Sequence, residues 1–196
     1  MGRNKEYIRE ELLEKSIQLF RKNGYHATGT DQLASEFGIN KKSLYAEFGS
    51  KLNLFQSCLE HYESTFLNLI LSPVENQNAN LERIKEVFQT IVKYGEKDLR
   101  GLGCLICNTS SDRGSLDPCI GPIVDRYFER IENGFYKALL NSKNSSNKIK
   151  SDNLKQISSF LTTTLVGIAT SIRAEAPVSQ IRKTYKFIEE YLKSLQ

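Results

Sequence analysis

The stretch Thr28-Gly-Thr-Asp-Gln-Leu-Ala-Ser-Glu-Phe-Gly-Ile-Asn-Lys-Lys-Ser-Leu-Tyr-Ala-Glu-Phe48 decides the fold of this chain. Its pattern predicts two short helices, over about 30–37 and 41–47, with a tight turn at Gly38 between them. The second helix is rich in Lys, Ser and Tyr, the residue types that reach DNA phosphates and base edges. This arrangement is typical of a helix-turn-helix, whose second helix docks in the major groove of DNA.

Local signals indicate where these helices begin and end. Gly24 suits the left-handed conformation that closes a preceding helix. Thr28 with Asp31 is a variant capping box for the first helix of the pair. Asn40 can cap the second helix, and Ser50 can cap the helix that follows it.

Helical periodicity continues along the rest of the chain, and no convincing alternating strand appears. We therefore expect an all-α protein of about nine helices, with a polar loop at Asn141–Asn147. One of the nine is a short apolar segment at Cys104–Cys107. The remaining helices outside the pair are expected at about 5–22, 51–73, 81–97, 118–139, 152–174 and 178–195.

The composition is that of a soluble globular protein. Of the 196 residues, 39% are hydrophobic and 26% are charged, and no apolar run approaches the roughly 18 residues of a membrane span. The start of the chain lacks the apolar region of a signal peptide, so we expect a cytoplasmic protein with no membrane partner and with its four cysteines as thiols. The net charge of +4 is not concentrated in the N-terminal quarter, so the spacing, rather than the charge, indicates DNA binding.

A family resemblance follows from the spacing. The matching residues are Gly24-Tyr25, Thr28, Leu33-Ala34, Gly38-Ile39, Leu44-Tyr45, Phe48, Lys51 and Leu54-Phe55. In order and register, this pattern over about residues 7–55 resembles the N-terminal motif of TetR/AcrR-type transcriptional regulators. Farther along, Gly103-Cys-Leu-Ile-Cys-Asn108 resembles a segment of one broad subgroup.

The resemblance implies a function and a division of labour. Residues 1–50 would form a three-helix DNA-binding head that contains the helix-turn-helix, and residues 51–196 a helical domain for effector binding and dimerisation. The protein would be a dimeric regulator, most often a repressor, that binds a pseudo-palindromic double-stranded operator. A small-molecule effector in the second domain would release the DNA.

Roles of single residues carry over with the motif. Lys41, Lys42 and Ser43 would reach base edges and nearby phosphates, although a lysine can equally belong to an ordinary solvated surface. The remaining expected contacts are with phosphates. These come from Thr28, Thr30, Tyr45 and Lys51.

Cys104 and Cys107 form the one chemically suggestive pair outside this region, since their spacing places both thiols on one face of a helix. They can be small buried hydrophobes, thiols that sense electrophiles or oxidants with Arg100 and Arg113 nearby in sequence, or part of a metal site that Cys119 could approach. Aromatic residues can line an effector pocket or simply fill the core; these are Tyr62, Phe66, Phe88 and Tyr127. No cofactor motif or convergent acid–base set appears, so we expect neither a cofactor nor an enzyme.

The helix expected over 152–174 is apolar nearly all round, which indicates burial on more than one side. In a chain of this size, a second copy of the protein can cover the spare side, which would give a two-fold dimer. The alternative is a plain central core helix. The residues expected at the dimer surface are Phe160, Leu161, Leu165, Ile168 and Ile172.

Overall fold

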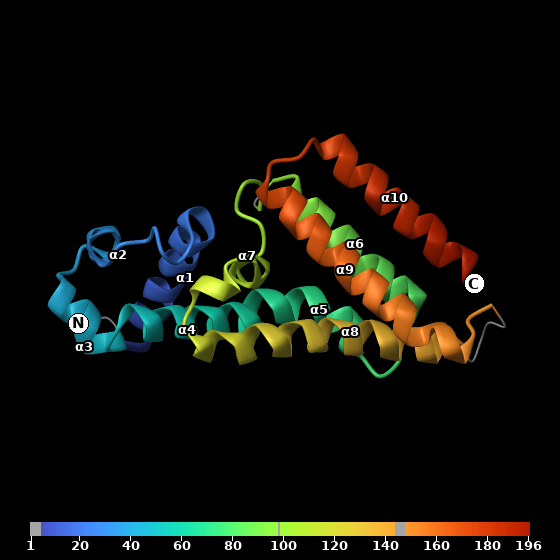
Figure 1. The fold of residues 1–196 in the computed structure, drawn as a ribbon, viewed down its shortest axis with the longest axis horizontal. Coiled ribbons are helices and arrows are strands. Elements are labelled where there is room, and N and C mark those ends of the chain that lie inside the picture. Colours follow the sequence, from blue (N-terminus) through green and yellow to red (C-terminus); the bar gives the residue numbers. More distant parts are fainter. Residues whose placement is uncertain (1–4, 98, 144–147) are drawn as a thin grey trace.

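The computed structural model describes residues 5–97, 99–143 and 148–196, and for residues 5–8 it describes the backbone alone. Within those ranges every regular element is a helix, which confirms the all-α prediction (Figure 1). The α-helices are α1 (Lys5–Asn23), α2 (Thr30–Phe37), α3 (Lys41–Phe48), α4 (Lys51–Tyr62), α5 (Asn68–Glu75), α6 (Leu81–Gly95), α7 (Leu105–Ser111), α8 (Gly121–Lys143), α9 (Leu154–Arg173) and α10 (Val178–Ser194).

The helix expected over 51–73 is a single rod with an irregular middle. A π-helical turn over Glu63–Leu67 joins α4 to α5 without a break, and with this rod counted once the described residues form nine α-helices. The sequence predicts an end at Pro73, but Pro73 lies in the last turn of α5, which continues to Glu75. The Leu69 carbonyl, which receives no N–H from Pro73, accepts a hydrogen bond from the Ser72 hydroxyl instead.

We call α1–α3 the head. Its turns have the predicted chemistry, since Gly24 and Gly38 adopt φ of 81° and 64°, in the left-handed region. The Asn40 side chain accepts a hydrogen bond from the Ser43 N–H at 2.8 Å, and this confirms the predicted cap of α3. The cap of α4 at Ser50 is confirmed in the same way.

The capping box predicted at Thr28 and Asp31 is wrong. The N-cap of α2 is Gly29, and no side chain caps this helix. Thr28 is fully buried, and its hydroxyl donates a hydrogen bond to the Gly24 carbonyl at 2.7 Å. The side chain therefore closes the turn between α1 and α2, because a buried hydroxyl takes the acceptor that lies within reach.

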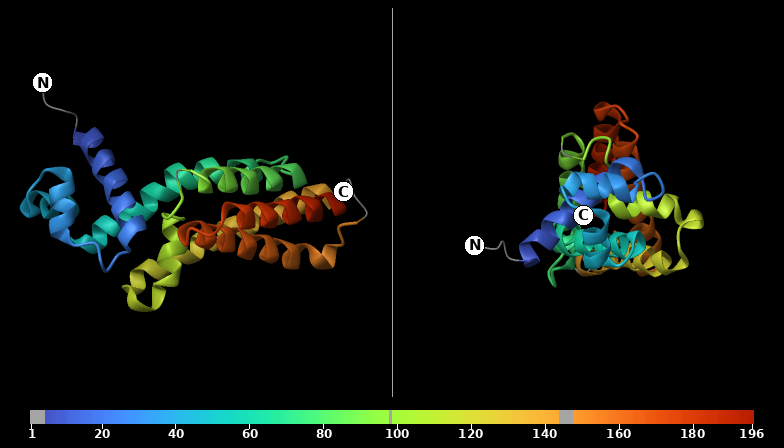
Figure 2. Two further views of the ribbon diagram at one scale, coloured as in Figure 1. Left: turned by 90° about the horizontal axis from the view of Figure 1, so that it is seen from above. Right: turned by 90° about the vertical axis from the view of Figure 1, so that its left-hand side faces the viewer.

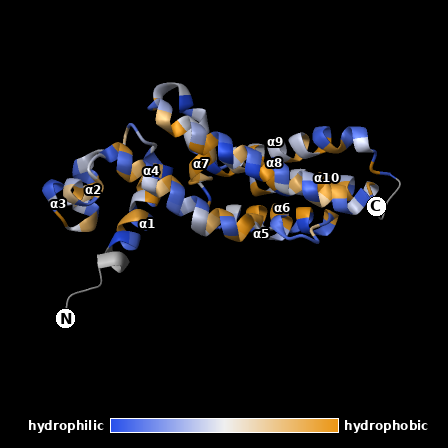
Figure 3. Ribbon diagram, turned by 90° about the horizontal axis from the view of Figure 1, so that it is seen from below, coloured by the Kyte–Doolittle hydropathy of each residue, from blue (hydrophilic) through white to orange (hydrophobic). Residues whose placement is uncertain are grey.

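The body, which we define as α4–α10, is a layered bundle to the right of the head in Figure 1. The rod of α4 and α5 lies along α8, while α9 packs on α8 and α6, and α10 covers α6 at the outer edge (Figures 1 and 2). The body helices carry hydrophobic and hydrophilic residues on different sides (Figure 3). α8 runs into the loop expected at Asn141–Asn147, whose residues 144–147 lie outside the described ranges. None of the described helices has the length and apolarity that crossing a membrane requires.

α9 is a central core helix, so much of the predicted dimer surface is wrong. Leu161, Leu165, Ile168 and Ile172 are all buried inside the chain itself, where α9 packs on α6 and α8. Only Phe160 is exposed, at 45%. The apolar residues on several sides of α9 are explained by neighbours on several sides within one chain, which is the alternative that the sequence left open.

Candidate nucleic-acid interface and interior cavity

α3 presents a polar surface at its N-terminal end. Lys41, Lys42 and Ser43 are exposed there, and Tyr45 is 43% exposed one residue after the buried Leu44. Leu44 and Phe48 anchor the opposite side of the helix in the core of the head. A short helix that is fixed on one side and polar on the other has the form of a recognition helix in a helix-turn-helix.

Lys41 is held by the neighbouring helix. Its Nζ lies 2.7 Å from Oδ1 of Asp31 on α2, and this hydrogen bond raises the pKa of Lys41. Lys42 forms no ion pair with the described residues. The two adjacent lysines therefore differ, because only Lys41 must leave a carboxylate before it can meet a phosphate.

The other predicted phosphate contacts have different surroundings. Thr30 is partly exposed at the start of α2, whereas the hydroxyl of Thr28 is buried and already bonded to Gly24, so the expectation that this hydroxyl meets a phosphate is wrong. The Nζ of Lys51 lies 4.3 Å from the centre of the Tyr25 ring, and partial burial lowers the pKa of Lys51. Lys51 is therefore positioned by a cation–π contact at the base of the head.

An apolar cavity of about 20 Å³ lies in the body, near its junction with the head. A space of this size holds little more than one water molecule. Of the residues predicted for an effector pocket, Phe66, Cys104 and Tyr127 line this cavity, but Phe88 instead stacks on Phe135 in the core. The remaining lining residues are Leu67, Ile70, Leu71, Ile91, Leu99, Gly103, Leu165, Ala169 and Ile172.

The cavity is polar at one end. The Tyr127 hydroxyl lies 3.6 Å from the sulfur of Cys104 and 3.7 Å from that of Cys107, so the structure brings the two predicted thiols to one phenol. Burial on its own would raise the pKa of Cys104, but hydrogen bonds with Cys107 and Tyr127 lower this pKa to about 6. The pKa of Cys107 is raised by its hydrogen bond with Cys104, so one of the two thiols ionises at the expense of the other.

The Tyr62 hydroxyl lies close to this polar end. It approaches Cys104 but satisfies no hydrogen-bond geometry with any described residue, although it is fully buried. Burial raises the pKa of Tyr62, and the positive charge of Arg21 opposes that shift. An unpaired buried hydroxyl destabilises the free protein. A ligand that offers a hydrogen-bond acceptor to this hydroxyl would therefore gain binding free energy.

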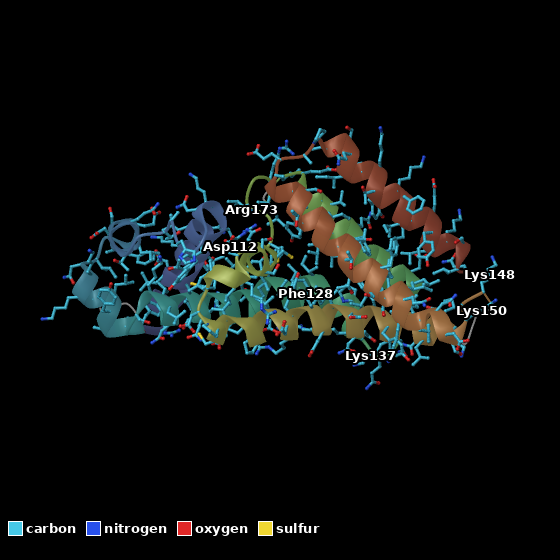
Figure 4. The ribbon with its side chains drawn as sticks, viewed as in Figure 1. Asp112, Phe128, Lys137, Lys148, Lys150 and Arg173 are labelled. Carbon is cyan, nitrogen blue, oxygen red and sulfur yellow. The ribbon has the colours of Figure 1, made fainter. Side chains whose placement is uncertain are left out.

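Sequence reasoning missed two arginines at the junction of head and body. Arg21 on α1 is only 4% exposed, and its guanidinium donates two hydrogen bonds to the Gly103 carbonyl, at 3.1 and 2.5 Å. Arg173, at the end of α9, donates in return to the Arg21 carbonyl, and Figure 4 shows it beside Asp112 at this junction. One signal was available for Arg21, because it stands four residues after the buried Ile17 and so continues the apolar side of α1.

Three residues that are near Cys104 and Cys107 in sequence have other partners in the structure. Arg100 donates to the carbonyls of Glu175 and Ala176, and Arg113 pairs with Asp125. Cys119 is exposed, 3.2 Å from the Gln56 amide nitrogen, whereas Cys104 and Cys107 are buried. No group of three or more His, Cys, Asp or Glu side chains in the described ranges could hold a metal ion.

Comparisons with known proteins agree with this architecture. Residues 12–58 match the sequence profile of the family described as bacterial regulatory proteins, tetR family. The HTH-type transcriptional regulator YezE of Bacillus subtilis, itself uncharacterised, is 31% identical over 143 residues, which are 73% of this chain and 74% of that protein. The transcriptional repressor BdcR of Escherichia coli is 24% identical over 99% of this chain and 93% of its own length.

A solved structure shares the fold. It is that of a cysteine mutant of the regulator CifR bound to a 26-base-pair operator DNA, with a TM-score of 0.77. The two chains cover each other completely, although only 18% of the aligned residues are identical.

Proposed function

Because this chain belongs to the tetR family of bacterial regulatory proteins, whose members bind DNA to regulate transcription, we propose that it is an effector-released repressor that acts in the cytoplasm as a homodimer. The observation that carries the DNA-binding part is the surface of α3, which exposes Lys41, Lys42, Ser43 and Tyr45 while Leu44 and Phe48 fix the helix from behind. The similar repressor BdcR and the operator complex of CifR support the proposal.

The proposed DNA contacts fall into two groups. Lys41, Lys42 and Ser43 reach base edges and nearby phosphates from the first turn of α3. Tyr45, Thr30 and Lys51 bind phosphates on either side, which positions the helix in the groove without reading sequence. The division of the chain at about residue 50, with DNA binding before it and effector binding and dimerisation after it, is part of the same proposal.

The dimer surface that we propose is the outer side of α9 and α10. Of the five residues expected at the dimer surface, Phe160 is the exposed one. Its ring packs edge-on against that of Tyr191 on α10, with 5.7 Å between the ring centres. Phe187, one turn before Tyr191, is 62% exposed. Exposed aromatic side chains that share a helix face are typical of an interface core, and a two-fold pairing would place the two heads on successive major grooves.

The DNA-binding proposal is tested with the duplex that lies upstream of the gene for this protein, by fluorescence anisotropy against a random duplex of equal length. We expect preferential binding that weakens as salt rises, and a loss of that binding in a Lys42→Ala/Tyr45→Phe variant. A Lys137→Ala variant, with its change at the distant end of α8, is the matched control (Figure 4). Equal affinity for both duplexes would exclude operator recognition.

A second candidate function has support in the geometry around Tyr127. A thiol that is hydrogen-bonded to a phenol and to a second thiol, with its pKa lowered to about 6, is mostly thiolate at neutral pH, and the thiolate is the reactive form. In this version the effector is an electrophile that alkylates Cys104 and thereby releases DNA. The alternative of a thiol- or metal-handling protein whose helix-turn-helix does not bind DNA is not supported, because the chain belongs to a family of DNA-binding regulators.

N-ethylmaleimide tests this version. Its alkene carbon bonds to the Cys104 sulfur, and the neighbouring carbon takes up a proton. We expect operator release by the reagent, at a rate that increases as pH rises through about 6, and no release in a Cys104→Ser variant. Cys119→Ser, which removes the exposed thiol, is the control. If Cys104→Ser still releases DNA normally, the buried pair has a structural role.

A further inference from the structure

A surface groove of about 380 Å³ lies on the other side of the cavity wall. It runs between α1 and the rod of α4 and α5, and its lining includes Arg21, His61, Tyr62 and Phe66. Phe66 also lines the interior cavity, so its side chain lies between the two spaces. Phe66 stacks on Tyr62 with 5.1 Å between ring centres and meets Tyr94 edge-on at 5.8 Å. Movement of the Phe66 side chain is therefore the shortest route by which the groove and the cavity could join.

The two sides of Phe66 differ in polarity. The cavity is lined almost entirely by aliphatic side chains of α5, α6 and α9, and its polar atoms are confined to the end at Cys104 and Tyr127. The groove holds the charged and polar side chains Glu14, Lys15, Gln18, Arg21, His61 and Thr65. A ligand that fills both spaces therefore has an apolar body and a polar end.

Two buried polar groups beside Phe66 could bind an anion. They are the Arg21 guanidinium, which has no carboxylate partner among the described residues, and the Tyr62 hydroxyl. Arg21 is buried to 96% but is paired only with the carbonyl of Gly103, and no carboxylate of the described residues forms an ion pair with it. The buried hydroxyl of Tyr62 meets no hydrogen-bond geometry with the described residues, although Cys104 lies near enough to shift its pKa, and the Tyr62 ring lies 5.9 Å from the Arg21 guanidinium. A buried cation next to an unpaired hydroxyl donor is complementary to an anion with two or more acceptor oxygens.

We propose that groove and cavity are the two halves of one effector site for an amphipathic carboxylate. Its apolar body enters past Phe66 and must widen the cavity, because the present space of about 20 Å³ holds little more than one water molecule. Its carboxylate accepts hydrogen bonds from the Tyr62 hydroxyl and the Arg21 guanidinium. This assignment names the ligand class of the effector site, and so it rests on the proposed function.

The remaining charges of the groove are consistent with this ligand, whereas a thiolate at Cys104, close to the Tyr62 hydroxyl, would repel it, so the carboxylate binds the form of the protein in which Cys104 is a neutral thiol. Lys15 is paired with Glu11 at 3.2 Å, so it contributes little net charge. Glu14 is the one carboxylate that lines the groove, and it stands seven residues before Arg21, about 10 Å away along α1. Arg21 is thus the dominant charge at the inner end, where the unpaired Tyr62 hydroxyl lies.

The site also connects to the head. Arg21 belongs to α1 and holds the Gly103 carbonyl, while Gly103 itself lines the cavity. A carboxylate that draws the guanidinium away from Gly103 would loosen one of the contacts that join α1 to the body. Ligand binding and the position of the head are therefore coupled through one side chain.

The test is calorimetric titration of the full chain, without DNA, with decanoate and naphthoate against decanol and naphthylmethanol, which share their apolar bodies. We expect the carboxylates to bind more tightly than the alcohols. Tyr62→Phe should weaken carboxylate binding by roughly tenfold, the loss of one hydrogen bond to a charged group, without changing the affinity for the alcohols. The same variant should melt at an equal or higher temperature than the parent when no ligand is present, because it removes an unpaired buried hydroxyl.

Tyr136→Phe on α8, which lines neither space, is the matched control and should leave all affinities unchanged. Phe66→Ala should speed carboxylate binding, since it removes the wall. The proposal is overturned if none of the carboxylates binds, if the alcohols bind equally well, or if Tyr62→Phe and Tyr136→Phe behave alike. Because these titrations contain no DNA, failure to bind an operator would exclude the regulator function and leave the carboxylate result standing.

Discussion

The ion pair between Lys41 and Asp31 bears on the proposed contact between the head and a phosphate backbone. Asp31 is highly exposed, with a relative exposure of 84% for its side chain, and it lies 2.7 Å from the lysine Nζ. In a DNA complex the carboxylate would compete with the phosphate for the same ammonium group, and it would itself be repelled by the duplex. Asp31 is thus an acidic side chain that opposes DNA binding, placed beside one of the residues proposed to promote it.

We therefore expect Asp31→Asn to tighten binding to the upstream duplex by about two- to fivefold at low salt, since the substitution frees Lys41 and removes a negative charge. Anisotropy titrations at several salt concentrations measure this effect, which should shrink as salt rises. Glu36→Gln removes the same charge from the other side of α2 and serves as the control. Unchanged or weaker binding by Asp31→Asn would show that Lys41 does not take part in the contact.

The backbone conformation and the close packing at Gly103 leave no room for a side chain. It adopts φ of 64°, and an added Cβ would lie 2.8 Å from the Arg173 Cβ and 3.1 Å from the Ala169 carbonyl oxygen. A side chain here is therefore strained and in contact with α9, at the point where Arg21 binds the backbone.

Gly103→Ala should lower the free energy of unfolding by about 1–3 kcal/mol, because the left-handed conformation and the close approach of α9 both oppose a methyl group. Chemical denaturation measures the change. Gly114→Ala, at a glycine with no atom within 4 Å of the added Cβ, should have little effect. A Gly103→Ala variant as stable as the parent would mean that the loop before α7 adjusts freely.

At the scale of elements, the two helices of the motif start in different ways. α3 is capped by the Asn40 side chain, whereas α2 starts at Gly29 with no side-chain cap. An eight-residue helix has few internal hydrogen bonds, so its cap is a large share of its local stability.

Asn40→Ala should therefore destabilise the protein by about 1 kcal/mol and weaken operator binding in parallel, because the first turn of α3 frays where Lys41, Lys42 and Ser43 lie. Urea denaturation and anisotropy provide the two readouts. Asn40→Asp retains an acceptor at the cap and should keep most of the stability. Loss of stability in both variants alike would argue against a capping role.

The rod of α4 and α5 explains how the head and the cavity share one element. Its π-helical turn over Glu63–Leu67 contributes Phe66 and Leu67 to the lining of the cavity, and Arg126 and Arg130 of α8 bind Glu63 there. Arg130 also pairs with Glu75 at 2.5 Å. The turn is thus anchored from α8, which fixes how the part that carries Lys51 is oriented relative to the part that carries Leu67.

At the scale of the whole molecule, exposed apolar side chains distinguish one outer face. Phe160 on α9 and Phe187 on α10 are exposed there, and the half-buried Tyr191 packs against Phe160, whereas Leu69 on α5 and Leu140 on α8 are exposed elsewhere. A cluster of aromatic side chains indicates an interface more strongly than isolated apolar residues do.

Phe187→Glu should convert a dimer to a monomer and lower operator affinity sharply, because a charge would be buried in the interface and each head would bind its half-site alone. Sedimentation velocity measures the mass, and anisotropy measures the affinity. Leu69→Glu, an equal change at a residue of similar exposure, should affect neither. If Phe187→Glu has the same mass as the parent protein, the outer face of α9 and α10 is not the interface.

The sequence by itself predicted the elements of this protein because their causes are local. Glycines at Gly24 and Gly38, side-chain caps at Asn40 and Ser50 and the spacing of apolar residues all act over a few positions, so they can be recognised in the chain alone. The family motif of the first quarter is also a local pattern, and it indicated DNA binding where net charge did not. Thr28 was misread because a threonine before a helix can turn its hydroxyl either to the helix or back to Gly24.

Only the tertiary structure decided which apolar side chains face the core and which polar groups meet. Leu161 and Ile172 have neighbours on several sides within the chain, whereas Phe160 does not, and periodicity cannot distinguish a partner helix of the same chain from one of a second copy. Arg21 and Gly103 are 82 residues apart in sequence, yet a hydrogen bond joins them. Contacts of this kind depend on how helices pack across the whole body. The sequence therefore indicated that the head binds DNA, whereas only the fold placed Arg21, Tyr62 and Cys104 together, at the proposed effector site.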